Sequence, residues 1–298
     1  MAEQKAPSAL AKLNNTTIAV QNQIDTYCKE GKLNLPQDYS VGNAIKQAQL
    51  MIQDNQDLMN CTQASLAKCL LDMAVLGLNV SKSQCYFVPY SNRAQLSVSY
   101  MGKIAIAKRV DPTIKEIFAR CVKQGEDFEF EDDVDGGTVI TKHKRTIESL
   151  GSKAIIAAYA TIVYNDGKPN KSLIMTFDRI KQSWKQSQLK PVNEDGSIKK
   201  NTTHDKFTEE MAQRTVINAI CKNIVNTSSD ADLFHETFAS VGLNENAAQV
   251  KAEAKEKMNS GDLVDVDFTE VSDDQQHEEV AIHFDEETGE IFDNVVDK

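Results

Sequence analysis

Motifs for metal binding, nucleotide binding and hydrolysis are missing from this sequence. No two of its six cysteines form a CxxC pair, and its five histidines do not cluster with them, so neither a zinc site nor a disulfide framework is expected. The phosphate-binding patterns GxxxxGK[ST] and GxGxxG are absent, as are the catalytic patterns GxSxG and HExxH. We therefore expect a protein that uses no cofactor.

Long apolar runs are missing as well. No segment approaches the roughly 20 apolar residues of a membrane-spanning helix, and the N-terminal residues lack the apolar stretch of a signal peptide. Cysteines scattered through apolar runs suit a reducing compartment. We expect a cytoplasmic protein without membrane contact.

Charge is present but unevenly spread. The net charge of −11 argues against nucleic-acid binding when it is taken alone. However, residues 251–298 hold four lysines and sixteen acidic residues, which leaves the other 250 residues with 29 cations and 28 anions. Within that near-neutral body, residues 151–200 hold nine cations and four anions. The average therefore hides a basic segment and an acidic tail.

Composition divides the 298 residues into three parts. Residues 1–38 are polar, with a weak helical pattern between Pro7 and Pro36, and we interpret them as an arm that orders only against a neighbour and serves oligomerisation. Residues 39–245 carry the apolar periodicity of a core. Residues 246–298 form the acidic tail, which we expect to be disordered in isolation.

Helix signals lie at both ends of the core. Ser40 and Thr62 are expected to cap the helices that follow them, and Gly77 to end the second of these helices. A further helix is expected over residues 177–188, and Thr208 is expected to cap the last strong helix.

Strand patterns fill the middle of the core. Residues 153–164 are apolar on both faces, so this strand is expected to be central in a sheet. The whole predicts an α+β fold, in which a central antiparallel sheet and hairpins are flanked by helices. The expected strands are residues 84–90 and 94–100, which form a hairpin, then 114–122, 127–133, 138–143, 153–164 and 171–175.

Two functions agree with the charged residues. The acidic cluster within residues 126–135, together with Asp166 after a strong strand, would suit a metal-dependent nuclease, in which carboxylates converge on divalent ions. Alternatively, cations interleaved with aromatic residues through the middle of the chain would suit a groove for single-stranded nucleic acid. The cations favour the second function, because many of them border apolar segments.

Four spaced motifs resemble the RecT/Redβ family of phage recombinases. They are "GLNVSKSQCYFVPYSNRAQLSVSYMGKIAIAKR", "DFEFE", "GSKAIIAAYA" and "FTEEMAQRTVINAI". The resemblance covers about residues 40–230. The resemblance implies a protein that anneals complementary single strands of DNA without ATP and is not a catalyst. It also implies rings or helical filaments, a partner exonuclease and a contact with a host single-strand-binding protein.

The resemblance and the charge pattern together nominate DNA-binding residues. Tyr100 and Trp184 are the aromatic candidates, and Trp184 either stacks on a base or lies in the core. The lysines of residues 190–206 are nominated by charge alone. The cationic candidates are Arg93, Lys103, Lys108, Arg109, Lys144, Arg145, Lys185, Lys190, Lys199, Lys200, Lys206 and Arg214.

Three interpretations of the acidic tail remain open. It binds a protein partner through its small apolar clusters, it keeps an assembly in solution, or it competes with DNA for the groove.

Overall fold

The computed structural model describes residues 8–133, 136–187, 190–228 and 233–242, together with the backbone of residues 283–284 and 291–292. The chain forms two units, so the residues expected to make one core are shared between them. The first unit contains the residues up to Ser99, with α10 and the short strands β8 and β9, and the second contains Tyr100–Ser229. The rest of the acidic tail lies outside the described residues. Among the described residues, no helix is long and apolar enough to cross a membrane.

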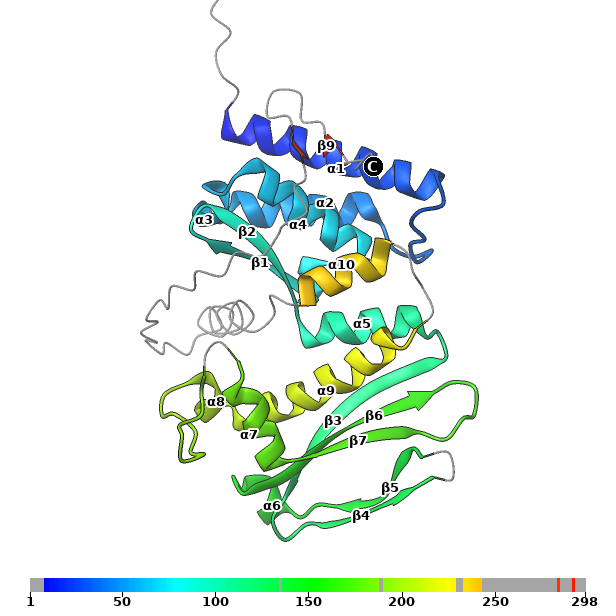
Figure 1. Ribbon diagram of the computed structural model, residues 1–298, viewed down its shortest axis with the longest axis vertical. Helices are drawn as coiled ribbons and strands as arrows, with labels where there is room; N and C mark the ends of the chain where they lie inside the picture. Colours follow the sequence, from blue (N-terminus) through cyan, green and yellow to red (C-terminus); the bar gives the residue numbers. More distant parts are fainter. Residues whose placement is uncertain are drawn as a thin grey trace, which may run out of the picture. The chain divides into compact units, whose positions relative to one another are not determined.

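The first unit packs helices against a two-stranded hairpin (Figure 1). Its hairpin consists of β1 (Cys85–Tyr90) and β2 (Arg93–Val98), as the sequence predicted, and β8 (His283–Phe284) pairs antiparallel with β9 (Ile291–Phe292). Its helices are α1 (Ala9–Lys29), α2 (Val41–Gln53), α3 (Gln56–Met59), α4 (Gln63–Val75) and α10 (Leu233–Gly242), with the 3-10 helix η1 (Val80–Lys82).

The predicted caps of α2 and α4 are confirmed. The Ser40 hydroxyl accepts a hydrogen bond from the Asn43 amide, and the Thr62 hydroxyl accepts one from the Ser65 amide at 3.3 Å. Gly77 follows α4 with a φ of +67°, a conformation that favours glycine and ends the helix. Both helices begin where the sequence predicted, because each capping side chain accepts a hydrogen bond from an amide that the first helical turn leaves unpaired.

Helix α1 finds its packing partners within its own chain. It lies against α2 and α4 and buries Leu13, Val20 and Ile24 completely, whereas the sequence predicted an arm that orders only against a neighbour. The helical signal is weak because the buried face also includes threonines. Thr16 is fully buried, and its hydroxyl hydrogen-bonds to Lys12 O and to Gln63 Oε1 of α4.

The second unit is built on a five-stranded antiparallel sheet. The strand order is β3-β6-β7-β5-β4, so the apolar strand β6 lies inside the sheet, as predicted. Its strands are β3 (Ile114–Lys123), β4 (Asp127–Asp132), β5 (Thr138–Lys144), β6 (Ile155–Tyr164) and β7 (Lys171–Thr176). Its helices are α5 (Tyr100–Val110), α6 (Ile147–Gly151), α7 (Phe177–Lys185), α8 (Thr203–Lys206) and α9 (Thr208–Asn226).

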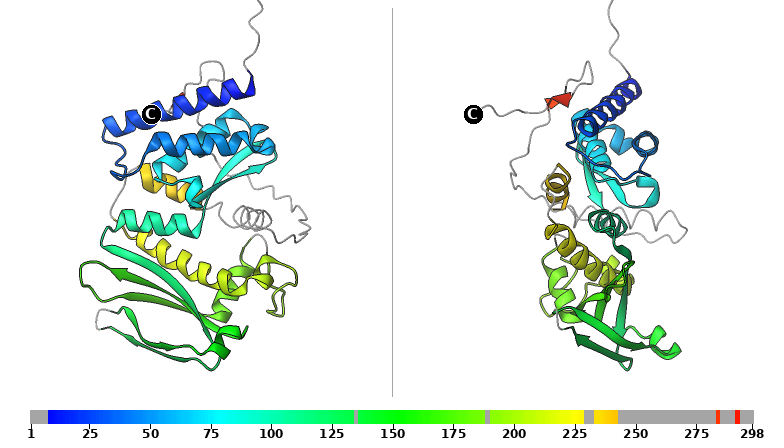
Figure 2. Two further views of the ribbon diagram at one scale, coloured as in Figure 1. Left: turned by 180° about the vertical axis from the view of Figure 1, so that it is seen from behind. Right: turned by 90° about the vertical axis from the view of Figure 1, so that its right-hand side faces the viewer.

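Helix α9 covers one face of this sheet. It packs on β3, β6 and β7, with α7 beside it and α5 against its other side (Figure 2, right). Cys121 of β3 and its cross-strand partner Ala158 of β6 are both buried, and the Cys121 thiol lies 3.5 Å from Glu209 O of α9. Because strand side chains alternate between faces, Phe118 and Arg120 point to the opposite face.

The predicted cap of α9 is wrong. The helix begins at Thr208, but its N-cap residue is Phe207, which makes no side-chain cap. The Thr208 hydroxyl instead donates to His204 O at 2.7 Å. The short helix α8, which the sequence did not predict, runs directly into α9 and offers Thr208 that carbonyl group.

Candidate nucleic-acid interface

The hairpin that carries Arg93 is fixed to the start of α4. The Thr62 amide donates to Asn92 O at 2.7 Å, and the Ala94 amide donates to Ser65 Oγ at 2.9 Å. Arg93 is the first residue of β2, next to the turn, and its side chain is exposed. The structure therefore places this predicted DNA-binding residue on the surface of the first unit.

The cations of α5 have different environments. Lys108 is exposed, and Arg109 and Tyr100 are half-buried. Lys103 is only 4% exposed, although the sequence predicted it to reach phosphates. Burial raises the pKa of the Cys221 thiol to about 12, and the positive charge of Lys103 partly opposes this rise. Lys103 therefore lies against α9, and its side chain is not presented to solvent.

Five exposed lysines lie between α7 and α9, and we call them the α7–α9 lysines. The loop that carries most of them is ordered by a bridge between Val192 and Ile198, and Val192 is buried. Lys185, at the end of α7, donates to Glu194 O at 3.2 Å and so ties the helix to this loop. The five are Lys185, Lys190, Lys199, Lys200 and Lys206.

Among the described residues, other lysines of the second unit form ion pairs, whereas the α7–α9 lysines do not. Lys142 bonds to Asp127 and Glu129, and Lys168 bonds to Asp166 at 2.6 Å. Within the described part of the chain, no carboxylate lies in ion-pairing distance of the α7–α9 lysines. The charge of Lys185 helps to lower the pKa of the nearby Asp195. The charges of the other four lysines are left for an anion from outside the chain, and polyphosphate is such an anion.

Trp184 and Arg214 lie in the core of the second unit. Trp184 is 4% exposed, and its indole N–H donates to the Thr215 hydroxyl at 2.9 Å. Its ring meets the buried His204 edge-on, with centroids 4.7 Å apart. Arg214 is 7% exposed. Of the two roles that the sequence left open for Trp184, the structure places this ring in the core, and it also removes Arg214 from the exposed cations.

Lys144 and Arg145 lie at the end of β5, and both are exposed. Lys144 is in register with Asp127, on the same face of the ribbon as the ion-paired Lys142. Arg145 is on the other face, near enough to Tyr159 to influence the pKa of its hydroxyl group. These two neighbouring cations therefore serve different surfaces.

The carboxylate of Glu126 is held by three donors. It accepts from Ser149 Oγ at 2.6 Å, from the Lys123 amide at 2.7 Å and from His143 Nε2 at 3.0 Å. Burial alone would raise the pKa of Glu126, but these hydrogen bonds outweigh it and lower the pKa below its ordinary value. Glu126 is therefore an ionised structural acceptor.

The acidic residues do not converge on one point. Asp127 and Glu129 bond to Lys142, and Asp166 lies beyond the other end of β6 from Glu126. A ten-residue strand spans about 30 Å, which is too far for one pair of metal ions. Asp135 lies outside the described residues, and among the described residues no group of three or more His, Cys, Asp or Glu could hold a metal. The structure thus offers no support for the nuclease alternative.

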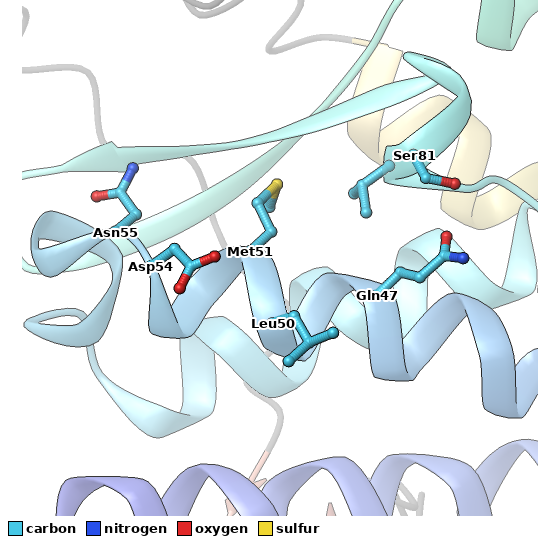
Figure 3. A pocket seen from close by; sticks show the side chains of 7 residues that line it. Gln47, Leu50, Met51, Asp54, Asn55 and Ser81 are labelled. Carbon is cyan, nitrogen blue, oxygen red and sulfur yellow. The ribbon is translucent and has the colours of Figure 1, made fainter.

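A shallow hollow lies on the first unit, and none of the predicted DNA-binding residues lines it. Leu50 and Met51 of α2 line it together with Ser81 of η1 (Figure 3). Its volume is about 490 Å³, and its lining includes no lysine or arginine. This hollow therefore has no chemistry for phosphate.

Arg120 and Phe130 were not among the residues nominated from the sequence, and both are exposed in the second unit. Alternation in β3 and β4 places them on the sheet face that α9 does not cover. The alternation within each strand was visible in the sequence. It did not show which face of the sheet α9 covers.

Comparison with known protein families gives a match over most of the chain. A family model described as "RecT family" matches residues 42–257, which is more than half of the chain. No curated protein and no solved structure matches the chain. The matched range covers all four motifs that resembled this family in the sequence. The chain belongs to the RecT family, whose members act in phage-type DNA recombination by single-strand annealing.

Proposed function

We propose that this RecT-family protein anneals complementary DNA strands without ATP by holding one strand through its backbone. The observation that carries the proposal is the group of α7–α9 lysines, which are exposed and form no ion pair with a carboxylate in the described part of the chain. Lys108, at the end of α5, shares both properties. Lysine contacts to phosphates fix the path of a strand and leave its bases unread.

Free base edges supply the specificity of the reaction. Two strands of DNA repel one another, and a cationic surface lowers that repulsion. Stacking in the duplex is worth about 1.4 kcal/mol for each base step, so a few matched steps hold a product that an unmatched encounter does not. The protein needs to supply only charge and alignment, and no bond to the DNA is formed or broken.

Further parts of the proposal rest on resemblance to the RecT/Redβ family. Arg93 and Arg109 would extend the phosphate contacts, and Tyr100 would support them. Copies of the chain would assemble into rings or filaments, to which α1 would contribute. A partner exonuclease would supply single strands, and a host single-strand-binding protein would contact the acidic tail.

One experiment tests annealing against cleavage. Complementary oligonucleotides are mixed with the protein, with magnesium or with a chelator, and the products are run on native and denaturing gels. We expect duplex with intact strands under both conditions and without ATP. Shortened strands that depend on magnesium would instead identify a nuclease.

Single-strand binding, measured as a shift of one labelled oligonucleotide on the native gel, tests the α7–α9 lysines. Replacing Lys199 and Lys200 together by alanine removes two phosphate contacts, which should weaken single-strand binding by about tenfold or more at 0.1 M salt. Lys168→Ala is the matched control, because Lys168 is exposed but already paired with Asp166. Equal effects of the double variant and the control would refute the assignment.

A further inference from the structure

The sheet of the second unit has one face that the helices α7 and α9 leave uncovered. Phe118 and Arg120 of β3 point to this face, because Cys121 points to α9. Arg120 is in register with Tyr159 of β6, which is in register with Ile174 of β7. We call this surface the open sheet face.

The ribbon of β4 and β5 folds over one end of the open sheet face. Strand β4 is at the far edge of the sheet from β3, yet only residues 124–126 join the two strands. The ring of Phe128 therefore stacks on Tyr159 with centroids 5.5 Å apart and an interplanar angle of 27°. His143 completes this cluster, with its ring 5.3 Å from Phe128.

Hydrogen bonds make this aromatic cluster rigid. His143 Nδ1 lies 2.9 Å from the Tyr159 hydroxyl, and His143 Nε2 lies 3.0 Å from Glu126. Glu126 is fixed in turn by Ser149 of α6. The positions of the rings are therefore set by a polar network as well as by packing.

One ring at the edge of the cluster is left uncovered. Phe130 lies 5.9 Å from Phe128 on the same face of β4, and it is 52% exposed. Large aromatic side chains are usually buried because their exposure to water costs free energy. A rigidly supported and exposed ring can stack on a nucleic-acid base of any sequence.

Arginines lie beside these rings on the same face. Burial raises the pKa of the Tyr159 hydroxyl, and the charges of Arg120 and Arg145 act in the opposite direction, so both guanidinium groups are near that ring. Both side chains are exposed. Glu116 is exposed at the opposite end of β3 and limits the cationic part of the face.

The two faces of the ribbon differ in how their charged side chains are paired. Asp127 and Glu129 are in register with Lys144 and Lys142 on the outer face, where they form the ion pairs of Lys142. The arginines are on the inner face with Phe130. The outer carboxylates are therefore paired with lysines, whereas the inner face presents both arginines to solvent, together with Asp132, which accepts a hydrogen bond from Thr138.

We propose that the open sheet face is a second binding site for single-stranded DNA, in which Phe130 stacks on a base while Arg120 and Arg145 contact phosphates. The proposal rests on the proposed annealing function, since it assigns this site to the second of the two strands. The α7–α9 lysines belong to helices and loops on the other side of the sheet. The α7–α9 lysines would hold the first DNA strand through its phosphates, and the open sheet face would hold the second strand through base stacking.

The test measures capture of a second strand. The protein is loaded with unlabelled oligo(dT) only to the amount that fills the site of the α7–α9 lysines, and a non-complementary oligonucleotide that contains 2-aminopurine is then added. Stacking on Phe130 should quench the 2-aminopurine fluorescence. Phe130→Ala should weaken capture of this second oligonucleotide by about 5-fold to 100-fold, with less than a twofold change in the affinity for oligo(dT).

Two further variants make the result specific. Phe130→Trp keeps an aromatic face and should retain capture and quenching. Ile147→Ala truncates another exposed apolar side chain of the same unit, 86% exposed on α6, and should change neither. Melting temperatures of all variants control for folding, and Phe130→Ala should lower stability only modestly because about half of the Phe130 side chain is already exposed.

The outcomes separate this proposal from the proposed function. Binding of oligo(dT) without any loss of capture in Phe130→Ala would overturn the second site and leave the annealing function standing. Failure to bind oligo(dT) at all would overturn both. Loss of capture in Phe130→Ala together with a change in oligomeric state would identify the face as a contact between protein copies, which also overturns the second site.

Discussion

Individual cations of the second unit differ chiefly in burial. Lys103 and Arg214 bury nearly all of their side-chain surface, whereas Lys108 and Lys199 are exposed. Long basic side chains have apolar stems that pack against other residues, so a cation beside an apolar run is no sign of exposure. The sequence located these residues in the right elements. It did not reveal their burial, because that depends on the packing of α5 against α9.

His204 is expected to make stability depend on pH. Burial and the charge of Arg214 lower its pKa from 6.5 to about 4. Between these values the unfolded chain binds a proton that the folded chain does not, so acidification through this window should destabilise the fold by up to about 3 kcal/mol. Urea denaturation at pH 7, 6, 5 and 4 should show this loss in the unmodified protein but not in His204→Gln. Parallel pH profiles for the two proteins would contradict the prediction.

Most elements were predicted where local signals determine them, although the predicted cap of α9 was wrong. The caps of α2 and α4 and the hairpin of β1 and β2 are found with small shifts at their ends. The return of β4 to the far edge of the sheet was not predictable, because no local pattern specifies which strands pair across a distance. Similarly, α8 spans only Thr203–Lys206, which is too short for a periodic pattern to develop.

The joint between α4 and the hairpin gives a prediction at this scale. Ser65→Ala removes the acceptor of the buried Ala94 amide, and an unsatisfied buried donor costs about 1–3 kcal/mol. We expect that loss in the free energy of unfolding, measured by chemical denaturation. Ser81→Ala, an exposed serine of the same unit, should stay within about 0.5 kcal/mol of the unmodified protein. A Ser65→Ala protein as stable as this control would show that the hydrogen bond between Ser65 and Ala94 does not stabilise the fold.

The whole molecule combines a body near electrical neutrality with a tail of net charge −12. The division of the body between Ser99 and Tyr100 was not visible in the sequence, since the motif that crosses this point reads as one continuous unit. DNA binding by the exposed cations stays a prediction, and these cations supply positive charge despite the acidic average.

Salt dependence tests which part of the chain carries the binding surface. Replacing Lys108 and Arg109 together by alanine should weaken single-strand binding and reduce the slope of log K against log salt by about 1.4, or about 0.7 for each lost contact. Removal of residues 251–298 should leave binding unchanged or tighter, because it removes repulsive charge. Fluorescence anisotropy between 50 and 300 mM salt measures both effects. A larger loss from the truncation than from the double variant would place the binding surface in the tail.

Strand β4 ends the sheet, and its outward side chains are Asp127, Glu129 and Glu131. An edge strand tends to recruit the edge of another molecule, and like charges prevent such pairing. These carboxylates therefore act as gatekeepers against aggregation as well as partners for Lys142. Their neutralisation by acid or by multivalent cations would remove that protection, so colloidal stability during purification and storage depends on keeping them ionised.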